Sequence, residues 1–264
     1  MNTAALAGKH VLVTRAIEQA QPLINRIEEV GGIAHVIPLL SFQAIEEAHH
    51  MEQVRNSLEH YQWLVFTSAN GVRFFFEAFK EDHLRSIIKK ANIAVVGNKT
   101  EAVLNQYGYQ ASLLPKHYVA EDLVLVLREH INEGERVLLP RGNLGRTYLP
   151  KALSAHGIEV DDLTVYKTVC PDVAKDHIQS LINEHIPLDV ITFTSSSAVK
   201  HYTQILEGLE LEDPFPYARI ACIGPIAEKT AQEYHLQVDI TASTYTIEGL
   251  IEAISTYFKE DENY

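Results

Sequence analysis

The fold is decided by a seven-residue segment that occurs twice, as FTSANGV at residues 66–72 and as FTSSSAV at residues 193–199. An apolar run precedes each copy, and apolar residues at helical spacing follow it. Each copy therefore predicts a strand, a turn of small polar residues and the start of a helix. Because the backbone N–H groups of such a turn lie at the positive end of the helix dipole, the turn suits an anionic ligand.

Other segments return at almost the same distance along the chain. Arg141 follows Arg15 by 126 residues, and Gly224 follows Gly97 by 127, which is also the distance between the two seven-residue segments. A near-constant offset across separate segments predicts an internal duplication of about 127 residues.

Strands and helices are expected to alternate along the chain. Residues 34–40 predict a strand interrupted by Pro38, and residues 46–61 predict a polar helix. Such alternation is typical of an α/β fold with parallel sheets and right-handed crossovers. The 264 residues are enough for two domains of about 100–150 residues each.

Composition excludes several classes of protein. The net charge of −13 argues against nucleic acid as a partner. Cys170 and Cys222 are too few for a disulfide scaffold, so we expect free thiols in a reducing compartment. The sequence contains no run of about 18 apolar residues and no recognisable signal peptide. We therefore expect a cytoplasmic protein that does not bind membranes.

The common catalytic motifs are absent from the sequence: it has no G-x-S-x-G, P-loop, G-x-G-x-x-G or H-E-x-x-H pattern. What remains is a set of hydroxyls, amides and arginines that follow predicted strands. Each serine or threonine could instead cap its own helix, each arginine could form an ion pair, and Tyr166 could belong to the core or to a hinge. Because ligands of open α/β sheets bind beyond the carboxyl ends of the strands, we expect these residues to line one cleft between two lobes.

Taken in order, the motifs resemble those of the uroporphyrinogen-III synthase family, and the resemblance covers almost the whole chain. The motifs that carry it are VLVTR (11–15), FTSANGV (66–72), VGNKT (96–100), LPRG (139–142) with Arg146, V-Y-x-T (165–168), FTS (193–195), IGP (223–225) and YTIEGL (245–250).

The resemblance implies two interleaved lobes, each a parallel sheet flanked by helices. Lobe one would comprise residues 1–38 and 170–264, and lobe two residues 41–166. Two linker segments of β type, near residues 37–40 and 165–170, would join them.

The implied reaction is the cyclisation of hydroxymethylbilane, a linear tetrapyrrole, with loss of water and inversion of the last pyrrole ring. The resemblance implies no cofactor and no metal. It also implies a monomer, and it makes the preceding enzyme of the pathway a candidate partner. The alternative is a non-catalytic bilobed protein that closes around an anionic metabolite.

The resemblance also implies roles for individual residues. Tyr166 matches the family's cleft tyrosine, which is expected to assist departure of the hydroxyl, and Thr100 matches a cleft threonine. Some relatives carry threonines where this chain has Ile226 and Ala227, so a catalytic hydroxyl is excluded there while the amides remain. The expected substrate-binding residues are Thr14, Arg15, Ser68, Ala69, Asn70, Asn98, Lys99, Arg141, Arg146, Ser195, Ser196, Ser197, Ile226 and Ala227.

Overall fold

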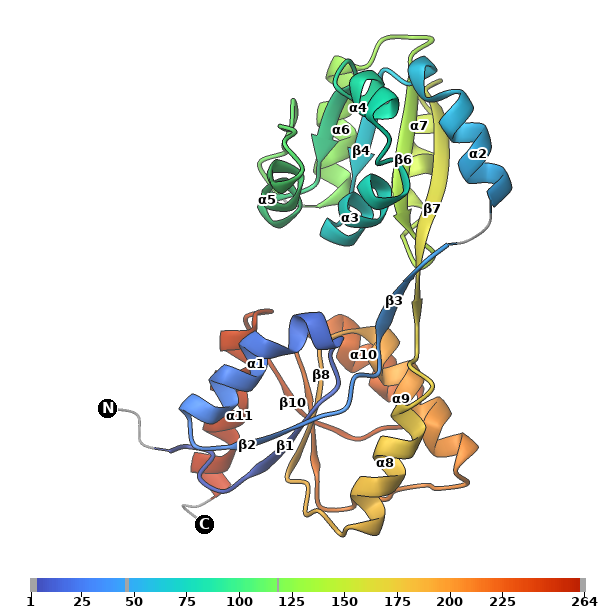
Figure 1. Cartoon of the computed structure of the whole chain (residues 1–264). Helices are drawn as coiled ribbons and strands as arrows, with labels where there is room; N and C mark the ends of the chain where they lie inside the picture. Colours follow the sequence, from blue (N-terminus) through green and yellow to red (C-terminus); the bar gives the residue numbers. More distant parts are fainter. Residues whose placement is uncertain (1–3, 46–47, 118, 262–264) are drawn as a thin grey trace. The chain divides into compact units, whose positions relative to one another are not determined.

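Two five-stranded sheets organise the protein (Figure 1). The computed structural model describes residues 4–45, 48–117 and 119–261. The chain divides into unit 1, residues 1–41 with 169–264, and unit 2, residues 42–168. It passes from one unit to the other twice, after Ser41 and after Thr168.

The sheet of unit 1 has the strand order β10-β9-β8-β1-β2, and its neighbours pair in parallel. Residues alternate between its faces: Val11 and Val13 of β1 join Leu23 of α1 and Leu250 of α11 in one buried cluster. The strands are β1 (His10–Val13), β2 (Ile33–Val36), β8 (Val190–Phe193), β9 (Arg219–Cys222) and β10 (Val238–Thr241). The helices are α1 (Ile17–Glu29), α8 (Ala174–Asn183), α9 (Ser196–Gly208), α10 (Pro225–Glu233) and α11 (Ile247–Asp261).

The sheet of unit 2 has the order β3-β7-β6-β4-β5, with β7, β6, β4 and β5 in parallel. Its strands are β3 (Ser41–Ala44), β4 (Trp63–Phe66), β5 (Asn92–Val95), β6 (Arg136–Gly142) and β7 (Glu159–Val169). Its helices are α2 (Ala48–Asn56), the 3-10 helix η1 (Leu58–His60), α3 (Ala69–Ala78), α4 (Asp82–Ile88), α5 (Asn98–Gln106), α6 (Ala120–His130) and α7 (Tyr148–Ser154).

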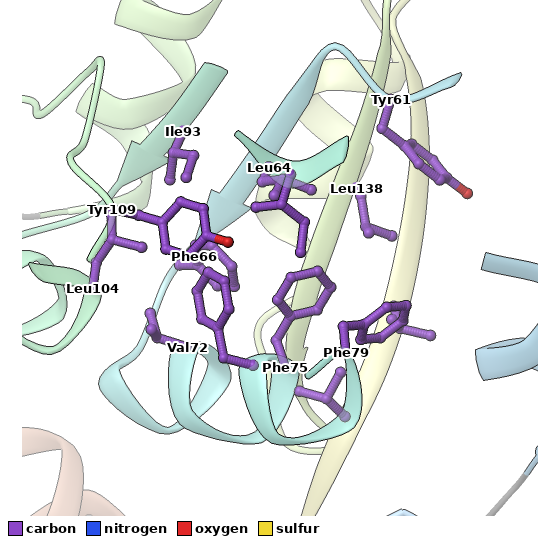
Figure 2. Packing of buried hydrophobic residues seen from close by; sticks show 14 of the residues in the cluster. Tyr61, Leu64, Phe66, Val72, Phe75, Phe79, Ile93, Leu104, Tyr109 and Leu138 are labelled. Carbon is purple, nitrogen blue, oxygen red and sulfur yellow. The ribbon is translucent and has the colours of Figure 1, made fainter. Parts of the chain in front are cut away.

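An aromatic cluster fills one face of the unit 2 sheet. Figure 2 shows Phe75 of α3 between Phe66 of β4 and Phe79, the residue that follows α3. The Phe75 ring meets the Phe66 ring with centroids 5.4 Å apart and stacks on the Phe79 ring with centroids 4.5 Å apart. The opposite face is covered by a second cluster that includes Val65 and residues of α6 and α7. A central strand of a parallel sheet is buried on both faces, so its sequence is a continuous apolar run. The strand Trp63–Phe66 has this pattern.

The two sheets correspond strand for strand. The order β5-β4-β6-β7 in unit 2 matches β9-β8-β1-β2 in unit 1, and the matched strands carry the segments that repeat in the sequence. The predicted duplication would build each unit from the first part of one repeat and the later part of the other. The duplication itself stays a prediction.

The predicted α/β class with two parallel, helix-flanked sheets is confirmed. The lobe limits near residues 38, 41, 166 and 170 stay predictions. Two local expectations were wrong: the strand expected at 34–40 ends at Val36, before Pro38, and the helix expected at 46–61 is split into α2 and η1 around Ser57. Residues 46 and 47 of that expected helix lie outside the described part of the chain.

Candidate functional site

A pocket of about 450 Å³ lies beyond the carboxyl ends of β4 and β6 in unit 2. In this sheet β4 lies between β5 and β6. The chain places β5 on one side of β4 and later places β6 on the other side, and crevices form beyond the carboxyl ends of strands where the strand order reverses in this way. We call it the unit 2 pocket. The lining residues that carry chemistry are Thr67, Ser68, Glu121, Arg141, Arg146, Tyr166 and Thr168.

Tyr166 of β7 forms one wall of the pocket. Its side chain is largely buried, and its ring stacks on Phe74 with centroids 5.2 Å apart and meets the edge of Phe42. A Cβ atom at Gly142 would lie 2.5 Å from Cζ of this ring, so glycine is required there by close approach. These contacts hold the phenol hydroxyl in one place, 3.4 Å from Oγ of Ser68.

Ser68 caps α3 at the floor of the pocket. Its Oγ accepts a hydrogen bond from the backbone N–H of Gly71 at 3.0 Å. An accepting hydroxyl keeps its own proton, so Ser68 can still donate to Tyr166 or to a ligand. Ser68 therefore caps α3 and can still donate a hydrogen bond in the pocket.

The two arginines of the pocket differ in what they contact. Arg141 donates through Nε and Nη2 to the carboxylate of Asp162 and through Nη1 to the carbonyl of Arg146 at 2.6 Å. Its side chain is 11% exposed, so its charge is neutralised internally. The side chain of Arg146 is exposed and has no hydrogen bond or ion pair within the described residues. Arg146 is therefore the cation that a ligand can reach.

Arg141 also shapes the loop 143–147 between β6 and α7. The backbone carbonyl of Arg146 binds its guanidinium, and a Cβ at Gly145 would lie 2.7 Å from Nη1. Asn143 fastens the loop to β7, since its N–H donates to the carbonyl of Tyr166 and its Oδ1 accepts from the N–H of Thr168. The loop is thus held against the strand that carries Tyr166.

The lining residues that were not predicted as site residues include a carboxylate and two exposed apolar side chains. Glu121 in the first turn of α6 places a carboxylate in the pocket, and Val119 and Leu144 are exposed apolar residues beside it. Glu121 recurs 127 residues later as Glu248, which was the available signal. The pocket therefore offers an anion, a free cation and apolar surface together.

Several expected residues of unit 2 lie outside the pocket lining. Ala69 and Asn70 begin α3, and the Asn70 side chain accepts a hydrogen bond from Arg73. Asn98 and Lys99 are exposed at the start of α5. Thr100 is the third residue of α5, and its side chain is 4% exposed. It is one of the buried residues of this helix, together with Val103 and Leu104. Its role stays a prediction.

In unit 1 the expected residues lie at the carboxyl ends of β1, β8 and β9. Thr14 is fully buried and donates to the carbonyl of Thr192 at 2.6 Å. Ser195 caps α9 by accepting from the N–H of Ala198 at 3.2 Å. Ser196 donates to the carbonyl of Ile226 at 3.2 Å and thus links the starts of α9 and α10. Most of these hydroxyls are occupied by the fold itself.

Other expected residues of unit 1 differ in exposure. Ser197 lies in the first turn of α9, Ala227 is buried in α10, and the Ile226 side chain is 64% exposed. Arg15 has one hydrogen bond, from Nη2 to Gln19 at 3.4 Å, and its buried Nε has no partner within the described residues. Burial lowers the pKa of its guanidinium.

Both cysteine thiols have raised pKa values, which lowers the fraction of the reactive thiolate. Cys222 is fully buried in β9, and burial raises the pKa of its thiol to about 12. Burial also raises the pKa of Cys170. The described residues contain no group of three or more His, Cys, Asp or Glu side chains arranged for a metal ion. None of the described helices has the length and apolar character needed to cross a membrane.

Comparisons with known proteins agree with the motifs. The family model described as uroporphyrinogen-III synthase HemD matches residues 21–252. The chain is 30% identical to the uroporphyrinogen-III synthase of Synechococcus elongatus over 97% of both chains, and 26% identical to that of Chlorobaculum parvum over 95% of this chain and 100% of the relative.

Solved structures share the fold. A uroporphyrinogen-III synthetase from Helicobacter pylori matches 95% of this chain and 99% of its own with a TM-score of 0.66 at 17% identity. A mutant synthase from Thermus thermophilus matches 96% of this chain and 100% of its own with a TM-score of 0.63 at 16% identity. The chain belongs to the uroporphyrinogen-III synthase family.

Proposed function

We propose that the unit 2 pocket binds a carboxylate-bearing part of hydroxymethylbilane while the chain performs the cyclisation typical of its family. The observation that carries this proposal is the free cation Arg146 beside the hydroxyl pair of Tyr166 and Ser68. An acetate or propionate group accepts hydrogen bonds from a guanidinium and from hydroxyls, and eight such groups decorate the substrate. The exposed Val119 and Leu144 offer apolar surface to a pyrrole ring.

Tyr166 is proposed to assist the first step. The C–O bond of the hydroxymethyl group breaks as the pyrrole nitrogen donates its electron pair into the ring, and the leaving oxygen takes up a proton from solvent and departs as water. The later ring closure releases one proton to solvent, which balances the proton taken up here. The phenol O–H of Tyr166 donates a hydrogen bond to that oxygen. Ser68, 3.4 Å away, and the Phe74 ring hold the phenol in orientation.

The product of that step is a cationic azafulvene, and Glu121 is proposed to stabilise it. Glu121 lies in the first turn of α6 and lines the same pocket. A fixed negative charge next to a developing positive charge lowers the barrier without rearranging at the moment of reaction. The substrate then closes on itself, and the protein selects the bend that inverts the last ring.

The strand ends of unit 1 are proposed to hold further carboxylates through backbone N–H groups. Ser195 and Ser196 use their hydroxyls within the fold, whereas the starts of α9 and α10 keep the unpaired amides of a helix N-terminus. Thr100 and Lys99 are secondary candidates at the start of α5. We also propose a monomer that acts in the cytoplasm and receives its substrate from the preceding enzyme of the pathway.

The test measures the isomers formed from hydroxymethylbilane with wild-type protein, without protein, and with Arg146→Gln. We expect the type III isomer with wild type and a KM about tenfold higher with Arg146→Gln, which corresponds to about 1.4 kcal/mol of lost contact. Arg128→Gln on the exposed side of α6 is the matched control and should behave as wild type. Formation of type I isomer alone would favour the non-catalytic binding protein.

A second variant tests the hydroxyl. Tyr166→Phe should leave the fold intact and slow type III formation several-fold, because it removes the donor to the leaving oxygen. An unchanged rate would remove Tyr166 from the chemistry while leaving the pocket as a binding site.

A further inference from the structure

A second hollow lies within unit 1, at the amino ends of its strands. It measures about 240 Å³ and is bounded by β8, β9, α9 and the segment 212–218 that connects α9 to β9. The functional segments of unit 1 follow the carboxyl ends of the same strands, so this hollow is a separate place. None of the roles discussed above uses it. We call it the amino-edge hollow.

The inner wall of the hollow is apolar. Ile191, Leu206, Phe215 and Ile220 line it and are each less than a tenth exposed. Its volume matches roughly eight water molecules at about 30 Å³ each. An occupant of similar size has about eight to ten non-hydrogen atoms, and the wall favours one with an apolar body.

One hydroxyl in this wall has no hydrogen-bond partner within the described residues. Tyr202 of α9 is 2% exposed, and its hydroxyl makes no hydrogen bond within the described residues, although its ring packs against Phe193. Because Tyr202 lines the hollow, an occupant can supply the missing hydrogen bond.

The charges at the hollow have a net negative sign. Arg219 is neutralised by Asp239, whose carboxylate lies 3.5 Å from its Nη1, and Asp239 also accepts the N–H of Ile220. Glu212 and Asp213 remain without an ion-pair partner within the described residues, and His235 stands at the same rim. Asp213 accepts one hydrogen bond, from the N–H of Phe215, through Oδ1, which leaves Oδ2 for a ligand. Burial, and to a lesser extent the Asp213 carboxylate, raise the pKa of the Tyr202 hydroxyl.

We propose that the amino-edge hollow is a binding site for a small organic amine with an apolar body. Its ammonium group donates to the Asp213 carboxylate and to the Tyr202 hydroxyl oxygen, and its apolar part lies against Leu206 and Phe215. The site is independent of the cyclisation, because it involves none of the residues assigned to that reaction.

The test titrates the full-length protein with phenethylamine and follows backbone amide resonances of residues 212–220 by NMR. We expect saturable shifts with a Kd of about 1 mM, as befits a ligand of about nine non-hydrogen atoms. The neutral isostere 2-phenylethanol and the anion hydrocinnamate should each bind at least fivefold more weakly, because neither places a positive charge beside Asp213.

Variants locate the contacts. Asp213→Asn keeps an acceptor for Phe215 and should weaken phenethylamine at least fivefold, and Tyr202→Phe should weaken it about threefold without lowering Tm. Glu207→Gln, on the exposed side of α9, is the control and should bind as wild type. The proposal is overturned by an absence of saturable shifts, by equal binding of the amine and the alcohol, or by equal effects of Asp213→Asn and Glu207→Gln.

Discussion

The carboxyl edges of the two sheets have the same backbone plan and different chemistry. In both, a serine caps the helix that follows the central strand: Ser68 accepts from Gly71 at 3.0 Å, and Ser195 accepts from Ala198 at 3.2 Å. The strand next to the central strand is β6 in unit 2 and β1 in unit 1. These two strands correspond in position, but their sequences and the connections after them differ. Arg141 lies within β6 near its carboxyl end, whereas Arg15 comes two positions after β1, and a different connection follows each arginine.

The two carboxyl edges differ in the length of the connection between the arginine and the next helix. Helix α1 begins at Ile17, two positions after Arg15, whereas α7 begins at Tyr148, seven positions after Arg141. The longer connection forms the loop 143–147, which wraps around Arg141 and presents Arg146. The two edges thus differ in the number of residues between the arginine and the next helix, which makes them chemically unlike.

The largest expected effect comes from Gly142→Ala. The new Cβ would lie 2.5 Å from the Tyr166 ring, which must move, and a displacement of about 1 Å in a catalytic group can cost about 100-fold in rate. The measurement is the rate of type III formation together with Tm. Gly208→Ala is the control, since its Cβ meets nothing closer than Nζ of Lys175 at 3.7 Å. Equal rates in both variants would mean that the reaction does not depend on the position of the Tyr166 ring.

Asp162→Asn should destabilise unit 2. It leaves the Arg141 guanidinium, 11% exposed, without a counter-charge. We expect a loss of about 2 kcal/mol, less than the roughly 3–5 kcal/mol of a fully buried pair, because Asp162 itself is 34% exposed. Urea unfolding followed by Trp63 fluorescence reports on unit 2. Glu159→Gln on the same strand breaks the exposed pair with Arg136 and should cost less than about 1 kcal/mol. A cost for Asp162→Asn no larger than this would reassign Arg141 to the ligand.

Ser68→Ala and Ser195→Ala compare the two edges directly. Each removes a helix cap and should lower stability by about 1 kcal/mol. Ser68→Ala should in addition slow type III formation about three- to tenfold, because it also removes a hydroxyl from the unit 2 pocket. Ser195→Ala leaves the amides of α9 in place and should keep the wild-type rate. Equal losses of activity would show that both edges act through their hydroxyls.

The smallest expected effect concerns pH. Glu135 accepts hydrogen bonds from the backbone N–H of Asn132 at 2.9 Å and from Nε1 of Trp63 at 3.2 Å, and these bonds lower its pKa in the folded state. Its contribution to stability is therefore complete above the ordinary pKa of about 4.5 and is lost as the pH falls through the lower folded value. Because Glu135 is only partly buried, the contribution is about 0.5 kcal/mol or less.

The pH dependence of the Glu135 contribution can be measured, because Trp63 is the one tryptophan of the chain. Urea midpoints from Trp63 fluorescence should converge for wild type and Glu135→Gln at pH 3 and differ slightly at pH 7. A difference that persists unchanged at pH 3 would show that the carboxylate charge contributes nothing.

Local patterns predicted much of the fold and part of the site. The apolar runs before residues 67 and 194 became β4 and β8, and the small polar turns became the caps Ser68 and Ser195. The pocket contains Ser68, Arg141, Arg146 and Tyr166 from the expected set. It lacks Thr100, since a helical residue's exposure depends on how the helix packs, which one sequence motif does not specify.

The partner of an arginine is the clearest case of what local patterns leave open. Arg141 and Arg146 were equivalent candidates, and Asp162 lies 21 residues beyond Arg141. The parallel register of β6 and β7 sets Arg141 opposite Thr164 and Leu139 opposite Asp162, which brings the Asp162 carboxylate within reach of the guanidinium. Pairing between strands is a long-range choice, so the ion pair that occupies one arginine and spares the other could not be inferred.

The sequence by itself determined the class of fold, the repeated strand–turn–helix segments and the family, because these depend on local periodicity and on the order of motifs. The tertiary structure alone decided which polar groups are occupied by the fold and which are left for a ligand. Hydrogen bonds such as Thr14 to Thr192 and Arg141 to Asp162 join residues from different strands. Packing of strands and loops thus leaves Arg146 and Tyr166 at one pocket while Thr14 is consumed by the core.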